Sequence, residues 1–296
     1  MNSNLNMILM GLLYKIIPAD KIMKIQTSFL QFILRKQHKL QKCIHYLEIS
    51  VVDHCNLNCK YCANFSPLAQ KTYLDIIDYE KDCRKLSEIS MNNVETIRLL
   101  GGEPLLHDKL EEIIFITRKY FSQSRIELVT NGLLLLKMND DFWRSCSDNT
   151  IIVSISHYPI KINYKAIQKT ASRFKVTVSY SKFAQPMFKW VLDIDGKQNS
   201  NESYLKCHRS NICVTLRNGK IYPCSMIPYV RYFNRYFNKE LLENEQDSFD
   251  LYQTNCFDEI LLFLSKAVPF CKYCNPNNII YSNKWEISKR EITEWT

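Results

Sequence analysis

The chain has 296 residues, of which 46% are hydrophobic, and this predicts a globular protein with one large domain or a domain with an appendage. Its twelve cysteines would suit a secreted disulfide-rich protein, but that class is short and loop-rich, so their grouping favours metal binding. The net charge of +9 lies mostly in residues 1–44, away from the predicted chemistry, and no nucleic-acid partner is expected.

The first 43 residues predict a basic helical arm. Residues 7–17 are apolar but too few to span a bilayer, and they contain Lys15. They lack the basic start and cleavage site of a secretory signal, so a cytoplasmic location is expected. Residues 22–35 place apolar side chains on one helical face, which predicts an amphipathic helix. We expect residues 20–40 to pack on the main domain, to form a dimer contact, or to lie peripherally on an anionic membrane.

From residue 44 onward, short β-rich runs alternate with longer amphipathic stretches. The predicted strands are 44–52, 94–100, 125–130, 150–156 and 175–180, with a weaker sixth run at 187–192. The predicted helices are 78–90, 108–121, 139–147 and 163–174. Strict alternation implies parallel strands joined by right-handed crossovers. Six such units are too few for a closed eightfold barrel of about 250 residues, so residues 44–195 predict a partial (β/α)6 parallel barrel of the α/β class.

Three cysteines follow the first predicted strand. Cys55, Cys59 and Cys62 are separated by three and then two residues. Four-iron clusters are normally held by four thiolates, so a compact set of three leaves one iron open to another ligand. Zinc is the alternative, but zinc sites usually use two pairs of ligands, and no second pair follows within the next few dozen residues.

A Gly-Gly-Glu-Pro segment, residues 101–104, follows the second predicted strand. Two glycines let the backbone come close to a ligand, and the proline stops the strand from continuing. Because working groups in such folds gather at the carboxyl ends of the strands, we expect this turn and the cysteine triplet to meet at one mouth.

The triplet, with the aromatic Tyr61 just before its last cysteine, resembles the signature of the radical S-adenosylmethionine (radical SAM) superfamily. The resemblance implies a [4Fe-4S] cluster on Cys55, Cys59 and Cys62, whose open iron binds the amino and carboxylate groups of S-adenosylmethionine. Reductive cleavage of S-adenosylmethionine would then give a 5'-deoxyadenosyl radical that takes a hydrogen atom from substrate.

The same resemblance assigns residues for binding S-adenosylmethionine. In the family the matching Gly-Gly-Glu-Pro segment binds the methionine amino group, and a hydroxyl or amide at the end of strand four commonly meets the ribose. No Gly-rich segment follows the fifth strand, so contacts to adenine stay unassigned. The candidates carried over are Tyr61, Gly101, Gly102, Glu103, Pro104, Asn131, Ser154 and Ser156.

A second group of cysteines begins beyond residue 200. Residues 213–224 predict a β-hairpin with an Asn218-Gly219 turn and a cysteine at each end. The spacing from Cys207 through Gly219 to Cys224 resembles the start of the auxiliary-cluster domains called SPASM and twitch, and a Cys-x-x-Cys pair closes it. The resemblance implies that residues 196–296 form a small cysteine-rich domain of the twitch type with one auxiliary [4Fe-4S] cluster, although a zinc knuckle fits the pair equally well. Five cysteines compete for four positions, and the choice stays open: Cys207, Cys213, Cys224, Cys271 and Cys274.

The sequence thus predicts a radical SAM enzyme acting on a small polar metabolite such as a sugar, aminocyclitol or nucleotide-linked sugar, which would make it an oxidoreductase, epimerase or related enzyme. It would need a reductant protein such as flavodoxin or ferredoxin. The first alternative is a maturase that modifies a peptide or protein side chain, although only 43 residues precede the first strand to hold a peptide-binding domain. The second alternative is a non-enzymatic iron-sulfur redox protein, which has no need for a Gly-Gly-Glu-Pro turn.

Overall fold

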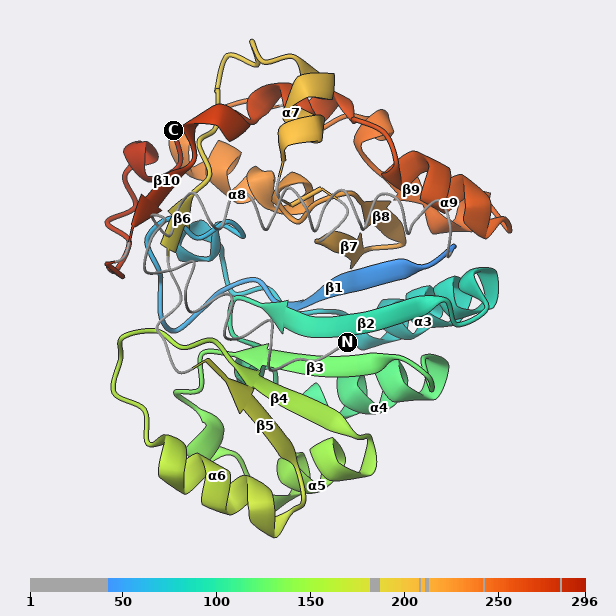
Figure 1. Ribbon diagram of the computed structural model, residues 1–296, viewed down its shortest axis with the longest axis vertical. Helices are drawn as coiled ribbons and strands as arrows, with labels where there is room; N and C mark the ends of the chain where they lie inside the picture. The colour runs from blue at the N-terminus through green and yellow to red at the C-terminus, as the bar shows by residue number, and fades with distance from the viewer. Residues whose placement is uncertain (1–41, 182–186, 208, 211–212, 242, 283) are drawn as a thin grey trace, which may run out of the picture.

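The computed structural model describes residues 42–296 apart from 182–186, 208, 211–212, 242 and 283. The predicted arm at residues 1–43 therefore lies almost wholly outside the described residues, and its amphipathic helix entirely so. The described chain forms an α/β structure around one large sheet, with helices against the sheet and a second group of elements above it (Figure 1).

The large sheet has eight strands in the order β5-β4-β3-β2-β1-β7-β8-β9. Neighbouring strands from β5 through β1 to β7 are parallel, whereas β7, β8 and β9 are antiparallel. A separate pair, β6 and β10, is antiparallel. The strands are β1 (Ile44–Val52), β2 (Val94–Gly101), β3 (Arg125–Thr130), β4 (Ile151–Ile155), β5 (Thr177–Tyr180), β6 (Met187–Lys189), β7 (Val214–Arg217), β8 (Lys220–Tyr222), β9 (Phe249–Asp250) and β10 (Ile280–Ser282).

The helices between the first five strands confirm the predicted alternation, and their ends lie close to the predicted ones. Asp75, Asn139 and Asn163 each accept a hydrogen bond from a backbone N–H in the first turn of the following helix, which fixes where α3, α5 and α6 begin. The helices are α3 (Ile76–Ser90), α4 (Leu110–Tyr120), α5 (Asp140–Asp148), α6 (Tyr164–Arg173), α7 (Ser200–Lys206), α8 (Met226–Phe237) and α9 (Phe257–Leu264).

The sixth parallel strand is not the one predicted. Residues 187–189 do form a strand, but it pairs with β10 outside the large sheet, and β7 takes the sixth parallel place beside β1. The reason lies in the connection: only six residues separate the end of β5 from β6, whereas a parallel pair needs a crossover of about a dozen or more. The sheet is therefore a partial parallel barrel that runs on into the segment predicted as a separate domain at 196–296, and the boundary at residue 195 stays a prediction.

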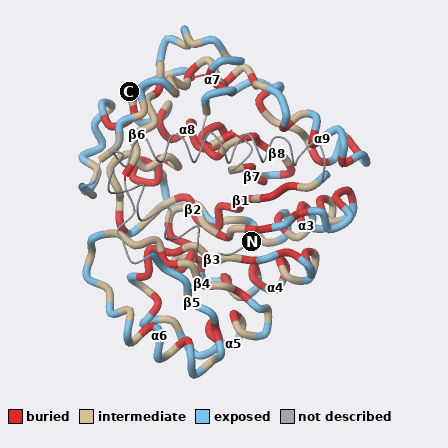
Figure 2. The backbone as a smooth tube through the Cα atoms, in the orientation of Figure 1, coloured by how far each residue is buried: buried red, intermediate tan, exposed pale blue. Residues whose placement is uncertain are grey.

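Burial follows this layout. Strand β1 is buried along nearly its whole length on both faces, as expected for a central parallel strand that is covered on both sides (Figure 2). A second apolar cluster forms around α8, where Phe65 from the loop after β1 packs against Phe233 and Trp295. This contact joins the beginning and the end of the described chain.

The predicted hairpin at residues 213–224 is confirmed. Strands β7 and β8 pair antiparallel, and Asn218 and Gly219 both have positive φ angles of 48° and 72°, the backbone that a two-residue turn of this kind requires.

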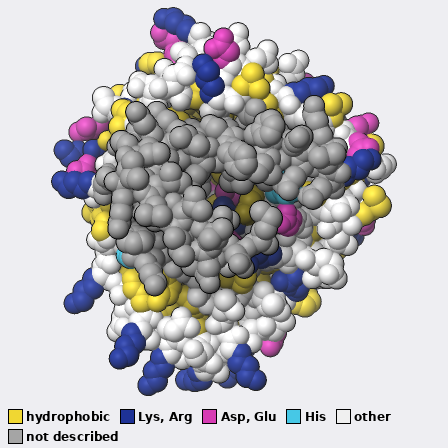
Figure 3. All heavy atoms as spheres, in the orientation of Figure 1, with side chains coloured by type: hydrophobic (Ala, Val, Ile, Leu, Met, Phe, Trp, Pro, Cys, Tyr) yellow, Lys and Arg dark blue, Asp and Glu magenta, His cyan; other side chains and the backbone are white. Residues whose placement is uncertain are grey.

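Lysine and arginine side chains project around α5 and α6 at the lower edge of the view (Figure 3). No described helix is long and apolar enough to cross a membrane.

Candidate active site

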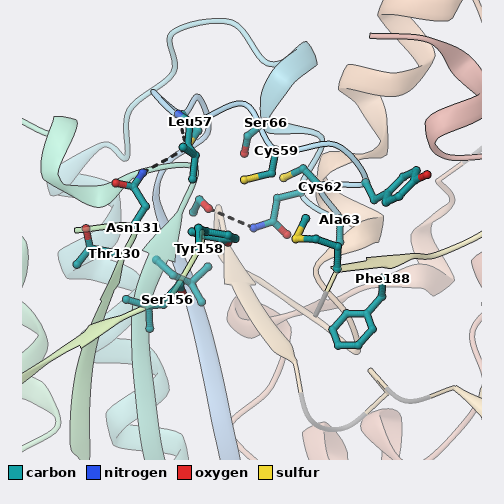
Figure 4. Close-up of a pocket in the computed structure, with 18 of the residues that line it drawn as sticks. Leu57, Cys59, Cys62, Ala63, Ser66, Thr130, Asn131, Ser156, Tyr158 and Phe188 are labelled. Atoms are coloured by element: carbon teal, nitrogen blue, oxygen red, sulfur yellow. Dashed lines mark hydrogen bonds between the residues drawn. The ribbon is translucent and has the colours of Figure 1, made fainter. Parts of the chain in front are cut away.

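The three cysteines of the triplet line one cavity of about 360 Å³ at the carboxyl ends of the parallel strands (Figure 4). The loop that carries them starts where β1 ends at Val52 and winds back through Asn58 and Tyr61, both with positive φ angles. The prediction that the triplet and the glycine pair meet at one mouth is borne out by the lining residues, since Gly101 and Gly102 line the same cavity.

The glycine turn is bound directly to the cysteine loop. The Gly102 N–H donates to Val52 O at 2.6 Å, and the Glu103 N–H donates to His54 O at 3.1 Å. A Cβ atom on Gly102 would lie 1.9 Å from His54 O, a separation that no side chain tolerates. Close backbone approach is therefore the reason for this glycine.

The Glu103 carboxylate is hydrogen-bonded to the end of β3. It accepts hydrogen bonds from the Thr130 hydroxyl at 2.6 Å and from the backbone N–H groups of Asn131 at 2.9 Å and Leu105 at 3.3 Å. Burial raises its pKa to about 7, although these three donors pull it down. Among the described residues, Glu103 and Pro104 do not line the cavity, so the carboxylate ties the ends of β2 and β3 together instead of facing a ligand.

The ends of the next strands supply polar groups to the cavity. Thr130, the last residue of β3, and Asn131, which follows it, line the cavity. Asn131 Nδ2 lies 3.8 Å from the Cys55 sulfur and 2.7 Å from Asn56 Oδ1. Ser156, just beyond β4, also lines the cavity. Ser154, two residues deeper in the strand, lines a neighbouring cavity of about 220 Å³ instead. Of the two candidate serines, the structure therefore brings Ser156 to the triplet.

An ion-pair network holds the start of the cysteine loop. Asp53 is buried, and its two oxygens accept from the two Arg217 Nη atoms at 2.7 Å each. The Tyr232 hydroxyl and Arg231 also donate to it. Burial pushes the pKa of Asp53 up, but the bonds and charge of Arg217, with help from Tyr232 and Arg231, outweigh this and hold it below its usual value. The loop is thereby fixed to β7 and α8.

Residues 286–288 lie along the cysteine loop, a contact that no local pattern in the sequence predicted. Lys60 N–H donates to Glu286 O at 2.9 Å, and Ser288 N–H donates to Asn58 O at 2.8 Å, so the two segments pair like short antiparallel strands. The Trp285 indole N–H donates to the Cys59 sulfur at 3.2 Å.

This environment fits an iron-sulfur cluster. Burial raises the pKa of Cys55 to about 11 and that of Cys59 to about 12, so both thiols stay protonated until a metal displaces the proton. N–H groups already point at the sulfurs: Leu57 N lies 3.4 Å from Cys55 Sγ, and Trp285 donates to Cys59. Sulfur ligands with surrounding N–H donors are the setting in which such clusters are held and tuned.

Four of the five later cysteines gather around a second, small cavity. Cys207, Cys224 and Cys274 line it. Cys271 is close enough for Cys207 and Cys224 to raise its pKa, after burial, to about 12. The four come from three separate segments: the end of α7, the end of the β7–β8 hairpin and the turn at 269–274.

Cys213 has a different neighbour. It lies just before β7, and the Glu48 side chain on β1 is close enough to raise the pKa of its thiol, after burial. Among the described residues, Cys213 does not line the cavity shared by the other three cysteines.

Residues 49–177 match the family model described as the radical SAM superfamily. The match covers less than half of the chain, so the similarity to that superfamily is shown for this segment. A GTP 3',8-cyclase of Clostridium botulinum (strain Okra / Type B1) is 33% identical over 140 residues, which cover 47% of this chain and 43% of that protein. A GTP 3',8-cyclase of Pelotomaculum thermopropionicum is 37% identical over 99 residues, which cover 33% and 30%. The chain thus spans less than half the length of the curated relatives that it matches. The family match and the names of the relatives indicate an enzyme.

Two solved structures are similar to this chain at low identity. BtrN in complex with AdoMet and 2-DOIA is 18% identical, with a TM-score of 0.49 over 78% of this chain and 93% of that one. Native anSMEcpe with bound AdoMet is 19% identical, with a TM-score of 0.37 over 46% of this chain and 43% of that one.

Proposed function

We propose that this protein is a radical SAM enzyme that abstracts hydrogen from a small polar metabolite of the sugar, aminocyclitol or nucleotide type. The observation that carries the proposal is one cavity lined by the three thiols, the glycine turn and the polar ends of β3 and β4. The relatives named GTP 3',8-cyclase support a substrate of nucleotide type. An electron-transfer protein such as flavodoxin or ferredoxin would supply the electron.

The cysteines and the glycines of the cavity would have separate roles. Cys55, Cys59 and Cys62 would hold the [4Fe-4S] cluster, which when bound supplies the electron that cleaves S-adenosylmethionine to the hydrogen-abstracting radical. Gly101 and Gly102 line the cavity, so S-adenosylmethionine would lie against their backbone.

Other groups at the mouth would orient S-adenosylmethionine and support its site. Asn131 and Ser156 would hydrogen-bond to its polar groups from the strand ends. Glu103 would support the site by joining Asn131 to the glycine turn.

Anaerobic reconstitution tests this proposal. Wild-type protein with dithionite and S-adenosylmethionine should form 5'-deoxyadenosine, and a variant with all three triplet cysteines changed to Ala should form none. A matched control is the pair Cys83→Ala and Cys146→Ala, since both are buried among apolar side chains away from the cavity. If the triple variant still forms 5'-deoxyadenosine, the assignment of the triplet is wrong.

We also propose that Cys207, Cys224, Cys271 and Cys274 hold an auxiliary [4Fe-4S] cluster of the twitch type. The support is the cavity that three of them line and the mutual electrostatic effect of all four. The thiol of Cys213 instead lies close to Glu48, which argues against a place in this set.

Iron counting separates these assignments. Wild-type protein should bind about eight irons, since each of the two cysteine sets looks able to hold a four-iron cluster. Cys207→Ala should lose about half of the iron, whereas Cys213→Ala, the matched control, should retain it. Equal loss in both variants would contradict the assignment. Zinc in the purified wild type would show that the second set is a structural zinc site.

A further inference from the structure

A row of charged side chains crosses the inner face of the barrel below the cavity. Glu48 on β1 is in register with Arg98 on β2, and Arg98 is in register with Glu127 on β3. Side chains in register on neighbouring strands point to the same face of a sheet. Glu48 lines the main cavity, and Arg98 and Glu127 line the neighbouring one, which shares Leu100, Val129 and Ser156 with it.

This row is unusual for a barrel interior. The inner layers of such barrels are dominated by branched apolar side chains, because buried charges lose their hydration. On the opposite face of the same strands the side chains are apolar, and Leu47, Ile97 and Leu128 are buried in the hydrophobic core. Placing the carboxylates of Glu48 and Glu127 on this face therefore costs stability that an apolar face would not cost, whereas the Arg98 side chain is still 31% exposed.

A second arginine faces the row from the other side of the cavity. Arg209 follows α7 and lines both the main cavity and the small cavity of the second cysteine set. Its Nη2 donates to the Ser225 hydroxyl, and its guanidinium lies over the Trp190 ring at 5.6 Å. Its charge interacts with that of Glu48, which also lines the main cavity.

The charges in this interior do not cancel. Glu127 is hydrogen-bonded to Arg125 at 2.7 Å, and its other oxygen lies 3.5 Å from Arg98 Nε, too far for a good hydrogen bond. Glu127 is thus shared between Arg98 and Arg125. Three arginines, Arg98, Arg125 and Arg209, are set against two carboxylates, Glu48 and Glu127, so the side chains of this region carry an excess of positive charge.

The two arginines also have unused donors. The buried Nε atoms of Arg98 and Arg209 have no hydrogen-bond partner among the described residues. A buried donor without a partner costs about 1–3 kcal/mol, so such atoms mark places where a ligand acceptor fits.

We propose that the substrate binds on this interior surface, formed by Glu48, Arg98, Glu127 and Arg209 and called the floor below. Arg209 and Arg98 bind an anionic group of the substrate, a phosphate or a carboxylate. Glu48 then meets a neighbouring hydroxyl of the substrate. The inference rests on the proposed function, because it places the substrate next to the site of S-adenosylmethionine. Arg209 and Arg98 bind substrate here and take no part in cleaving S-adenosylmethionine.

The test is anion binding by the reconstituted protein loaded with S-adenosylmethionine, measured by titration calorimetry. The probes are inorganic pyrophosphate and malonate, which separate phosphate from carboxylate recognition. Arg209→Met and Arg98→Met keep the apolar stem and remove the charge. Arg144→Met is the matched control, because Arg144 is exposed and pairs with Asp140 and Asp141 on the outer helix.

We expect at least one anion to bind the wild type and the control equally, and to bind each floor variant at least tenfold more weakly. Unchanged binding by the floor variants, or no binding of either anion to the wild type, overturns the inference. Loss of iron from the second cysteine set in Arg209→Met, with Arg98→Met unaffected in anion binding, also overturns it, because Arg209 would then only neutralise that set. If the wild type forms no 5'-deoxyadenosine, the proposed function fails, and the anion titration still reports on the floor by itself.

Discussion

Changing Asp53 to Asn should strongly destabilise the protein, because it breaks a buried ion pair on one side only. The carboxylate and Arg217 form two bonds of 2.7 Å, and their side chains are only 3% and 12% exposed. Asparagine offers one acceptor oxygen and no charge, and its amide group would face the N–H groups of Arg217. Removing one partner of a buried pair typically costs about 3–5 kcal/mol. That is a large part of the roughly 5–15 kcal/mol by which a domain is stable.

The measurement is urea unfolding of the apo protein at pH 7, followed by iron counting after reconstitution. Asp258→Asn is the matched control, since Asp258 pairs with Lys42 at the exposed surface, where such pairs contribute about 0–1 kcal/mol. Because the pKa of Asp53 is lowered in the folded state, its contribution is present above the unfolded pKa and is lost as the pH falls through the folded one. The difference between wild type and Asp53→Asn should therefore be constant from pH 6 to 8 and shrink in acid. A cost below about 1 kcal/mol at pH 7 would refute this reasoning.

Three further outcomes are expected. Gly102→Ala should lose iron and 5'-deoxyadenosine formation, since its Cβ would meet His54 O at 1.9 Å; a variant with normal iron content would contradict the close approach. Trp285→Phe removes the N–H donor to Cys59. If this hydrogen bond stabilises the reduced cluster by about 1 kcal/mol more than the oxidised one, it raises the midpoint potential by roughly 40 mV. The midpoint potential of the variant should therefore be lower by about that amount in an EPR-monitored redox titration. An unchanged midpoint potential would show that the Trp285–Cys59 hydrogen bond has no effect on the redox equilibrium of the cluster. Glu103 has a pKa raised to about 7, so the stability it contributes is full below about pH 4.5 and is lost as the pH rises through 7. The advantage of wild type over Glu103→Gln in urea unfolding should shrink by about 3 kcal/mol from pH 4.5 to 8, and a constant difference would exclude this titration.

Local patterns in the sequence predicted the parts of the site that depend on neighbours along the chain. The alternation of strands and helices predicted a parallel sheet, and a parallel sheet brings the ends of its strands to one edge, so the meeting of Cys55 with Gly102 followed from it. The Asn218-Gly219 turn was equally local, because positive φ at two successive residues needs such a pair.

Contacts between distant segments had no such signal. The place of β7 beside β1 depends on which edge of the sheet was still open, and no residue type encodes that. The pairing of residues 286–288 with the cysteine loop is likewise a long-range contact. The charged floor did leave a trace in the sequence: Glu48, Arg98 and Glu127 are charged residues inside predicted strands, and the register of the parallel sheet aligns them.

The cover that residues 285–295 place over the cysteine loop has a consequence for biosynthesis. During translation the barrel strands leave the ribosome well before Trp285 and Trp295, which hold Cys59 and the backbone of Cys62. Until those residues emerge, one side of the thiol loop is open to scaffold proteins and to oxidants alike. The order of the chain thus leaves an interval in which this side of the thiol loop is uncovered.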